Sequence, residues 1–242
     1  MIVAESIGFA GTHSICDILT GIPGVEASHG TQNFETRGPI GTPAQTPEAF
    51  VDSMLRARDS GSHPVALHTN FPPVAMKGAC DTRGVRYELL VRAPERQIDS
   101  CYAWAMKKVL DGDAAVLLTA FKMAVQPAAE LRLEANLPNL VYIFAARHVC
   151  TFNLTALALG APIVQMEDVL NHESAFRSAF DLAEAGPIAH FEGEAIHRAS
   201  HRADSGLQAV AEPDREAIRA ALPIVVGAHR VSIEEMGKLL GY

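Results

Sequence analysis

Short apolar runs alternate along the chain with segments in which apolar residues recur at helical spacing. Five runs are bounded by Pro, Gly or charged residues: MIVAESI (1–7), HPVALHT (63–69), YELLVR (87–92), NLVYIFA (139–145) and PIVQM (162–166). Such runs are typical of buried parallel strands. Their alternation with helices predicts an α/β fold, an open and mostly parallel sheet with helices on both faces. Ligands of such sheets bind at the carboxyl ends of the strands.

Two of the expected helices have recognisable ends. Residues 46–48, Thr-Pro-Glu, predict a helix start with an N-cap, a proline in the first position and a favourable acidic residue, and Gly61 follows its end. Pro94 begins a second helix that stops near Gly112. Residues 186–215 show the least regular pattern, so we expect a long surface loop or a lid there.

Length and charge narrow the classes of protein. The chain has 242 residues, of which 48% are hydrophobic, enough for one sizeable core, and we expect residues 1–242 to form a single domain. The formal net charge of −8 argues against a nucleic-acid binder, because such proteins neutralise phosphates with a basic face. Any phosphate site must therefore be local.

The four cysteines show no C-x-x-C spacing, and no signal segment precedes them. A disulfide framework or a zinc knuckle is therefore not expected, and cytoplasmic residence is the default expectation. We expect no apolar run to reach the roughly 18 to 20 residues that span a bilayer, so no integral membrane segment is predicted. The sequence leaves the oligomeric state open.

A glycine-rich segment follows the first predicted strand. Residues 8–14, Gly-Phe-Ala-Gly-Thr-His-Ser, fit a strand-to-helix loop in which backbone amides, with Gly11, Thr12, His13 and Ser14, would contact an anion. The segment lacks the lysine of G-x-x-x-x-G-K-[ST], which disfavours a Walker-type nucleoside triphosphatase. A glycine turn that only tightens the join of strand and helix is the structural alternative.

A second candidate phosphate contact lies after the YELLVR strand. Arg92 ends this strand, and Ser100 follows eight residues later in the next helix. A planar guanidinium binds a phosphate through two hydrogen bonds, and a hydroxyl can complete the contact. Arg92 could instead be a structural arginine paired with Glu95.

With this spacing the chain resembles the P-loop sulfotransferases, in which such an arginine and serine hold the 3′-phosphate of 3′-phosphoadenosine-5′-phosphosulfate (PAPS). ALHTNFPP (66–73) occupies the place of the family's strand that ends Lys-Thr-His-x-Pro. PIVQMEDVLNHESAFRSAFDLA (162–183) is similar to the family's strand, Glu-Asp-Leu and long helix, and KLLGY (238–242) resembles the end of many bacterial members.

The resemblance implies a sulfotransferase-like architecture with PAPS as the sulfate donor and 3′-phosphoadenosine-5′-phosphate as the product. The acceptor would be a hydroxyl of a small molecule, a sugar or a glycolipid. In the family, a Lys or Arg precedes the Ser-Gly-Thr of the loop. This chain has Phe9 and Ala10 at those positions and so departs from the family pattern. A replacement cation could come from Lys77 or from HRASHR (197–202), where the family has a basic loop over the nucleotide. The residues of that stretch are His197, Arg198, His201 and Arg202.

Three histidines are candidates for the catalytic base. His68 leads because it follows a buried strand and imidazole titrates near neutral pH, while His13 lies in the loop and His29 follows the next turn. A structural hydrogen-bonding role is the alternative for each. Glu167 and Asp168 fit best as charges that favour a helix start. The His197–His201 spacing could indicate a metal, but the neighbouring arginines argue against one.

Two other functions stay open at this level. The chain could be a protein of sulfotransferase fold that binds a nucleotide or an anion without transferring sulfate, as the absent loop cation would allow. A nucleotide kinase with an altered P-loop would need a lysine and a Mg-binding hydroxyl that cannot be placed in this sequence.

Overall fold

The computed structural model of the protein describes residues 1–29, 46–183, 186, 188 and 208–242. The chain divides into two compact units. The first comprises Met1–Arg92 and Thr155–His197, and the second Ala93–Leu154 and Arg198–Tyr242. That the units form one domain stays a prediction. Most of the expected lid lies outside the described residues.

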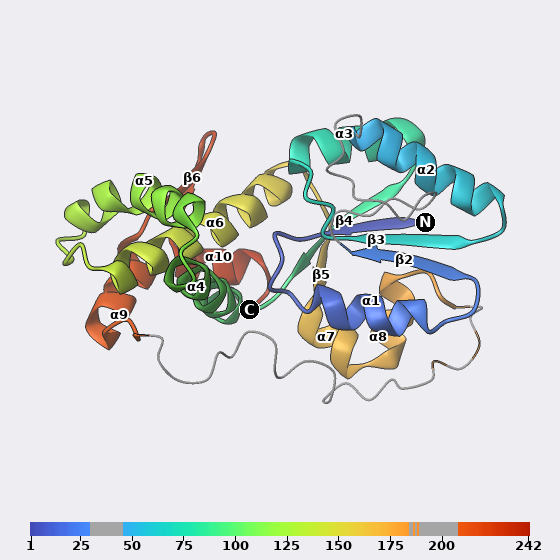
Figure 1. Ribbon diagram of the computed structural model, residues 1–242. Helices are drawn as coiled ribbons and strands as arrows, with labels where there is room; N and C mark the ends of the chain where they lie inside the picture. The colour runs from blue at the N-terminus through green and yellow to red at the C-terminus, as the bar shows by residue number, and fades with distance from the viewer. Residues whose placement is uncertain (30–45, 184–185, 187, 189–207) are drawn as a thin grey trace. The chain divides into compact units, whose positions relative to one another are not determined.

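The first unit contains a parallel sheet of five strands in the order β2-β3-β1-β4-β5 (Figure 1). The predicted open parallel α/β fold is therefore confirmed. Central strand β1 pairs with β3 on one side and with β4 on the other, and Glu5 lies opposite Leu89. The strands are β1 Ile2–Glu5, β2 Val25–His29, β3 His63–Leu67, β4 Arg86–Val91 and β5 Ile163–Gln165.

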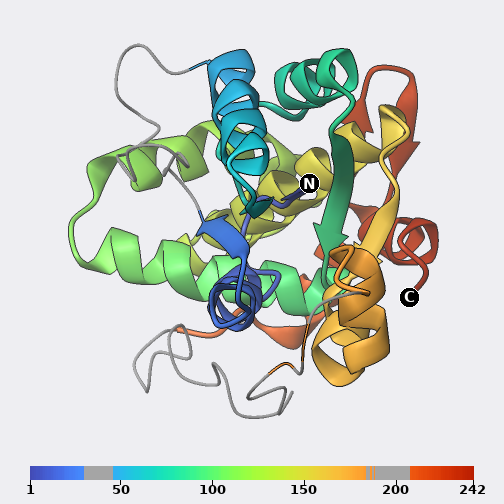
Figure 2. The ribbon, with the colours of Figure 1, turned by 90° about the vertical axis from the view of Figure 1, so that its right-hand side faces the viewer.

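Helices cover both faces of this sheet. In both ribbon views α2 and α3 lie on one face, and α1, α7 and α8 lie on the other (Figures 1 and 2). Ile2 and Ala4 of β1 pack with Leu19 of α1 and Phe176 of α8 in one apolar core. The helices are α1 Thr12–Thr20, α2 Pro47–Asp59, α3 Pro73–Arg83, α7 Met166–Asn171 and α8 Glu173–Ala179.

Four of the five predicted strand runs contain strands. The exception is residues 139–145, which lie inside the 22-residue helix α6, Leu137–Ala158. A short apolar run can belong to a strand or to a buried helix, and periodicity alone does not separate the two. The sequence pattern also missed β2, because VEASH (25–29) contains one β-branched residue and mixes polar with apolar positions.

The predicted helix ends agree with the structure where local chemistry sets them. Thr46 caps α2 by accepting a hydrogen bond from the Ala49 N–H at 3.2 Å. Helix α4, Pro94–Leu110, begins and ends as expected. The expectation of one long helix after Glu167 and Asp168 is wrong. The backbone of His172 is extended and separates α7 from α8.

The second unit is mainly helical. Its core joins α4, α5 and α6 through Ala105, Met106, Ala120, Val141 and Phe144. The last turn of α6, from Thr155, belongs to the first unit. The remaining elements are α5 Ala114–Glu130, α9 Glu212–Ala221, the antiparallel pair β6 Ile224–Val226 and β7 His229–Val231, and α10 Ile233–Leu239 (Figure 1).

Helix α6 amends the expectation about apolar runs. By length and composition it could cross a membrane, with a mean hydropathy of 1.3 over its most apolar 18 residues. Of that window, 67% is buried within the protein, which is what a core helix of a globular protein also shows. One such helix is weak evidence for a membrane span.

Candidate anion and acid–base site

The topology of the sheet marks one place for a ligand. Strands β1 and β3 are neighbours, but β1 leads into α1 on one face and β3 leads into α3 on the other (Figure 1). In open α/β sheets, ligands bind in the crevice at the carboxyl ends of two strands whose connections diverge in this way. The glycine loop follows β1, and His68 follows β3.

The glycine loop joins β1 to α1 as predicted. Gly8 and Gly11 have φ angles of 97° and 66°, and Gly11 is the N-cap of α1. A Cβ on Gly11 would lie 2.7 Å from the Met166 sulfur, so this glycine is required by packing as well as by its backbone conformation. The Ser6 hydroxyl accepts the Gly8 N–H at 3.1 Å and helps to shape the loop.

Three histidines from three elements lie beside this loop. The ring of His13, in α1, stacks on that of His29, at the end of β2, with 3.8 Å between centroids and a 30° tilt. The His29 ring lies 5.5 Å from that of His68, which follows β3. We call these three side chains the histidine stack. The structure therefore brings together the three residues that were separate candidates for the base.

Thr12 is tied to the histidine stack. The Thr12 hydroxyl and Nε2 of His29 form a hydrogen bond of 2.8 Å. Thr12 is 3% exposed. Ser14, on the same helix turn, is also buried. The predicted contact of Thr12 and Ser14 with an anion stays a prediction, and the observed contact shows that Thr12 orients His29.

His68 has a fixed tautomer and an uncommon backbone conformation. Its Nδ1–H donates to the Ser6 carbonyl at 2.6 Å, so the neutral ring carries its lone pair on Nε2. A Cβ on Gly8 would lie 3.7 Å from this Nε2, which places the ring against the glycine loop. The φ angle of His68 is 52°, a left-handed conformation that is uncommon outside glycine and is often found at functional sites.

Burial keeps two members of the stack neutral. Desolvation, together with the charges of His13 and His68, lowers the pKa of His29 to about 4. Burial also lowers the pKa of His68, against the hydrogen bond to Ser6, which raises it. At neutral pH both rings are therefore neutral imidazoles.

Glu5 is a residue of this site that the sequence analysis missed. Its carboxylate is fully buried at the end of β1 and accepts the Thr69 N–H at 2.8 Å, the Ser6 N–H at 3.2 Å and the Thr69 hydroxyl. Burial raises the pKa of Glu5 to about 7, although these hydrogen bonds act to lower it. Glu5 thus fastens the start of the glycine loop to the residue after His68.

Of the predicted replacement cations, Lys77 lies among the described residues. The Lys77 ammonium donates to both carboxylate oxygens of Asp81, one turn further along α3, at 2.9 and 2.7 Å. The stretch with Arg198 and Arg202 lies outside the described residues. Ala10 is fully buried, so its position offers no room for a longer cationic side chain.

The two predicted 3′-phosphate contacts belong to different units. Arg92 follows β4 at the carboxyl edge of the sheet and closes a segment of the first unit. Ser100 lies in α4 of the second unit, where its hydroxyl donates to the Arg96 carbonyl at 2.9 Å. Their joint contact with a phosphate stays a prediction. Glu167 and Asp168 occupy the first turn of α7, as expected for charges that favour a helix start.

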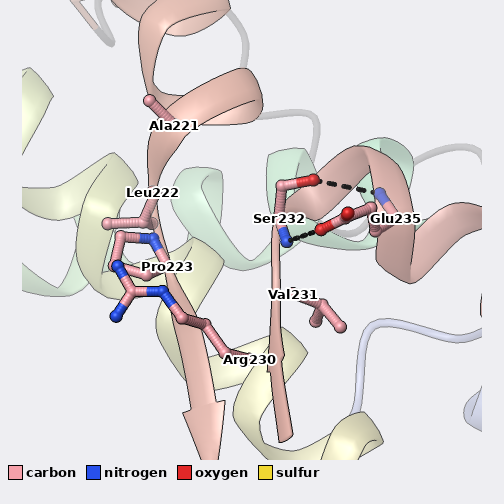
Figure 3. A pocket seen from close by; sticks show the side chains of 7 residues that line it. All are labelled: Ala221, Leu222, Pro223, Arg230, Val231, Ser232 and Glu235. Carbon is pink, nitrogen blue, oxygen red and sulfur yellow. Dashed lines mark hydrogen bonds between the residues drawn. The ribbon is translucent and has the colours of Figure 1, made fainter.

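A shallow hollow of about 220 Å³ in the second unit lies beside the start of α10 (Figure 3). Its polar lining includes Ser232 and Glu235, which hydrogen-bond to each other.

Among the described residues, no three His, Cys, Asp or Glu side chains are arranged to hold a metal ion. The three side chains of the histidine stack are not arranged in that way either. None of the four cysteines forms a disulfide.

Comparison with known proteins gives likeness in structure and no match in sequence. No protein-family model matches the chain, and no curated protein matches its sequence. The structure is similar to the crystal structure of a sulfotransferase from Alicyclobacillus acidocaldarius, with a TM-score of 0.45 and 14% sequence identity. The likeness covers 79% of this chain and 84% of that one.

Proposed function

We propose that the protein transfers a sulfuryl group from PAPS to a hydroxyl of a small molecule, a sugar or a glycolipid. The observation that carries the proposal is the histidine stack beside the glycine loop, at the point where the connections of β1 and β3 diverge. An anion loop and a neutral base at the same strand ends are the two things that this reaction needs.

The residues around the loop fit a dianionic phosphosulfate. Helix α1 begins at Gly11 with no acidic residue in its first turn, so no side chain of that turn opposes its positive end. Arg92 follows β4, the neighbour of β1, and so lies at the same edge of the sheet. A guanidinium at this edge suits a second phosphate.

His68 has the orientation for proton transfer. Its Nε2 accepts the proton of the acceptor hydroxyl as the oxygen forms its bond to sulfur, while Nδ1–H stays on the Ser6 carbonyl. PAPS supplies the sulfuryl group, and the bond from sulfur to the bridging oxygen breaks with its electron pair on the leaving 3′-phosphoadenosine-5′-phosphate. The positive end of α1 stabilises the charge on the leaving phosphate.

Calorimetry with 3′-phosphoadenosine-5′-phosphate and transfer of labelled sulfate from PAPS test this proposal. We expect binding, and we expect Arg92→Ala to weaken it by about 10- to 100-fold, the usual effect of losing hydrogen bonds to a charged group. Arg58→Ala is the matched control, because Arg58 makes an exposed pair with Asp59 on α2. No binding by the unaltered protein would refute the proposal.

A second candidate is binding without transfer. Phe9 and Ala10 stand where the resemblance expects a cation, and the Lys77 ammonium is directed at Asp81. In that case 3′-phosphoadenosine-5′-phosphate binds, but no acceptor in a cell extract receives labelled sulfate. Transfer to any acceptor excludes this alternative.

A further inference from the structure

The glycine loop has one titratable side chain. Between residues 8 and 14, His13 alone can become positively charged. It is exposed on the first turn of α1, and its ring is stacked on His29. Any full positive charge that a side chain of the loop offers to an anion must therefore come from His13, which belongs to this stacked pair.

We propose that the His13–His29 pair is the positive pole of the anion site and takes up one proton when a phosphosulfate binds. This inference rests on the proposed function, since it concerns the same ligand. It assigns separate tasks within the histidine stack: the pair binds charge, and His68 remains the neutral base.

The geometry of the pair limits the uptake to one proton. With centroids 3.8 Å apart and planes tilted by 30°, one imidazolium can lie over the face of a neutral imidazole, an attractive arrangement. Two imidazolium rings at this distance repel each other, so the second proton is strongly disfavoured.

The surroundings of the pair explain why it takes up its proton only when a ligand binds. Burial is the main cause that disfavours protonation of His29. A charge on His13 or His68 would oppose it further, whereas Asp17 of α1 favours it. On the sheet side, Glu5 is buried and bound to Thr69. A dianion beside the rings adds the favourable charge that is missing, and so moves the balance toward imidazolium.

His68 has a different environment. Its Nδ1–H is fixed on the Ser6 carbonyl, and its ring is 5.5 Å from His29 rather than in close stacking. A charge on the neighbouring pair opposes its protonation, which keeps Nε2 available for the acceptor's proton. The uptake by the pair and the basicity of His68 are therefore compatible.

Calorimetry with adenosine 5′-phosphosulfate tests the inference, because this probe has no phosphate that titrates near neutral pH. Titrations in two buffers of different ionisation enthalpy give the number of protons taken up. We expect about one proton near neutral pH and an affinity that falls about tenfold for each unit of rising pH. His13→Gln should remove both the uptake and the pH dependence.

Two further variants make the test specific. His13→Lys carries a fixed charge, so it should bind the probe without proton uptake. His229→Gln, an exposed histidine in β7, should behave as the unaltered protein does. Binding with no proton uptake, or an uptake that persists in His13→Gln, overturns the inference and leaves the proposed function standing. Failure to bind either this probe or 3′-phosphoadenosine-5′-phosphate overturns both.

Discussion

Helices α1 and α10 begin in opposite ways. At α10 the Ser232 hydroxyl accepts the Glu235 N–H at 3.1 Å, and the Glu235 carboxylate accepts the Ser232 N–H at 2.7 Å. At α1 the N-cap is Gly11, which has no side chain to accept, and the first turn contains no acidic residue. The start of α10 is completed by its own residues, whereas that of α1 suits an external anion.

The two helix starts also differ in shape and in chemistry. The hollow beside α10 is concave, but two of its polar residues already satisfy each other in the helix cap (Figure 3). The start of α1 has imidazole rings from β2 and from the segment after β3 beside it. Convergence of titratable groups from several strand ends, rather than a hollow, is what favours α1 as the site.

The largest effect is expected when His68, the proposed base beside α1, is replaced. His68→Gln should lower the rate of sulfate transfer by about 10²- to 10⁴-fold, the usual contribution of a general base, with little loss of nucleotide binding. Initial rates with labelled PAPS measure this, and His229→Gln is the control. A rate within a few-fold of the unaltered protein would show that His68 is a structural residue.

A side chain added at Gly11, where α7 lies close to the start of α1, should reduce the stability of the protein. In Gly11→Ala the new Cβ meets the Met166 sulfur at 2.7 Å at a positive φ, which should lower the free energy of unfolding by about 3 kcal/mol. Gly24→Ala is matched in φ, at 79°, but meets nothing within 4 Å, and should cost about 1 kcal/mol. Urea unfolding distinguishes the two, and equal losses would contradict the packing argument.

Glu5 should make stability depend on pH. Its usual pKa of 4.5 rises to about 7 in the folded chain, so between these values the folded state holds a proton that the unfolded state has lost. The contribution of Glu5 to the free energy of unfolding is complete below the lower pKa. It declines as pH rises through the upper pKa, by about 2 kcal/mol between about pH 5 and about pH 7.

Glu5→Gln isolates this contribution, since the amide stays neutral and can still accept from Ser6 and Thr69. His29 acts in the opposite direction, because its pKa is lowered, and it is unchanged in this variant. The difference in unfolding free energy between the two proteins therefore reports Glu5 alone. A difference that does not vary with pH would mean that Glu5 does not titrate in this range.

The smallest effect is expected at the start of α10, which is capped by its own residues. Ser232→Ala removes the cap of α10 and should cost about 1 kcal/mol of stability. It should leave the affinity for 3′-phosphoadenosine-5′-phosphate unchanged, as calorimetry would show. A weakened affinity would contradict the assignment of the two helix starts to different roles.

The sequence predicted best what local chemistry decides. The starts of α2 at Thr46 and of α4 at Pro94 depend on capping and on proline, both of which can be recognised from neighbouring residues. His13, His29 and His68 could each be named as a candidate because histidines near strand ends stand out. Residues 139–145 were assigned wrongly, because an apolar run takes its structure from the packing around it.

The remainder depends on contacts between distant parts of the chain. The histidine stack forms because β3 lies between β2 and β1, an order that no local pattern shows. Glu5 looked like the polar end of an apolar run, and its burial is compensated by Thr69, 64 positions later. Neither convergence could be derived from spacing along the sequence.

The most direct test follows the histidine ring signals by NMR while 3′-phosphoadenosine-5′-phosphate is added. If the glycine loop and the histidine stack form the anion site, the signals of His13, His29 and His68 shift together and saturate, while His229 stays in place. Binding that leaves the three rings unperturbed would contradict the assignment of the site to the start of α1.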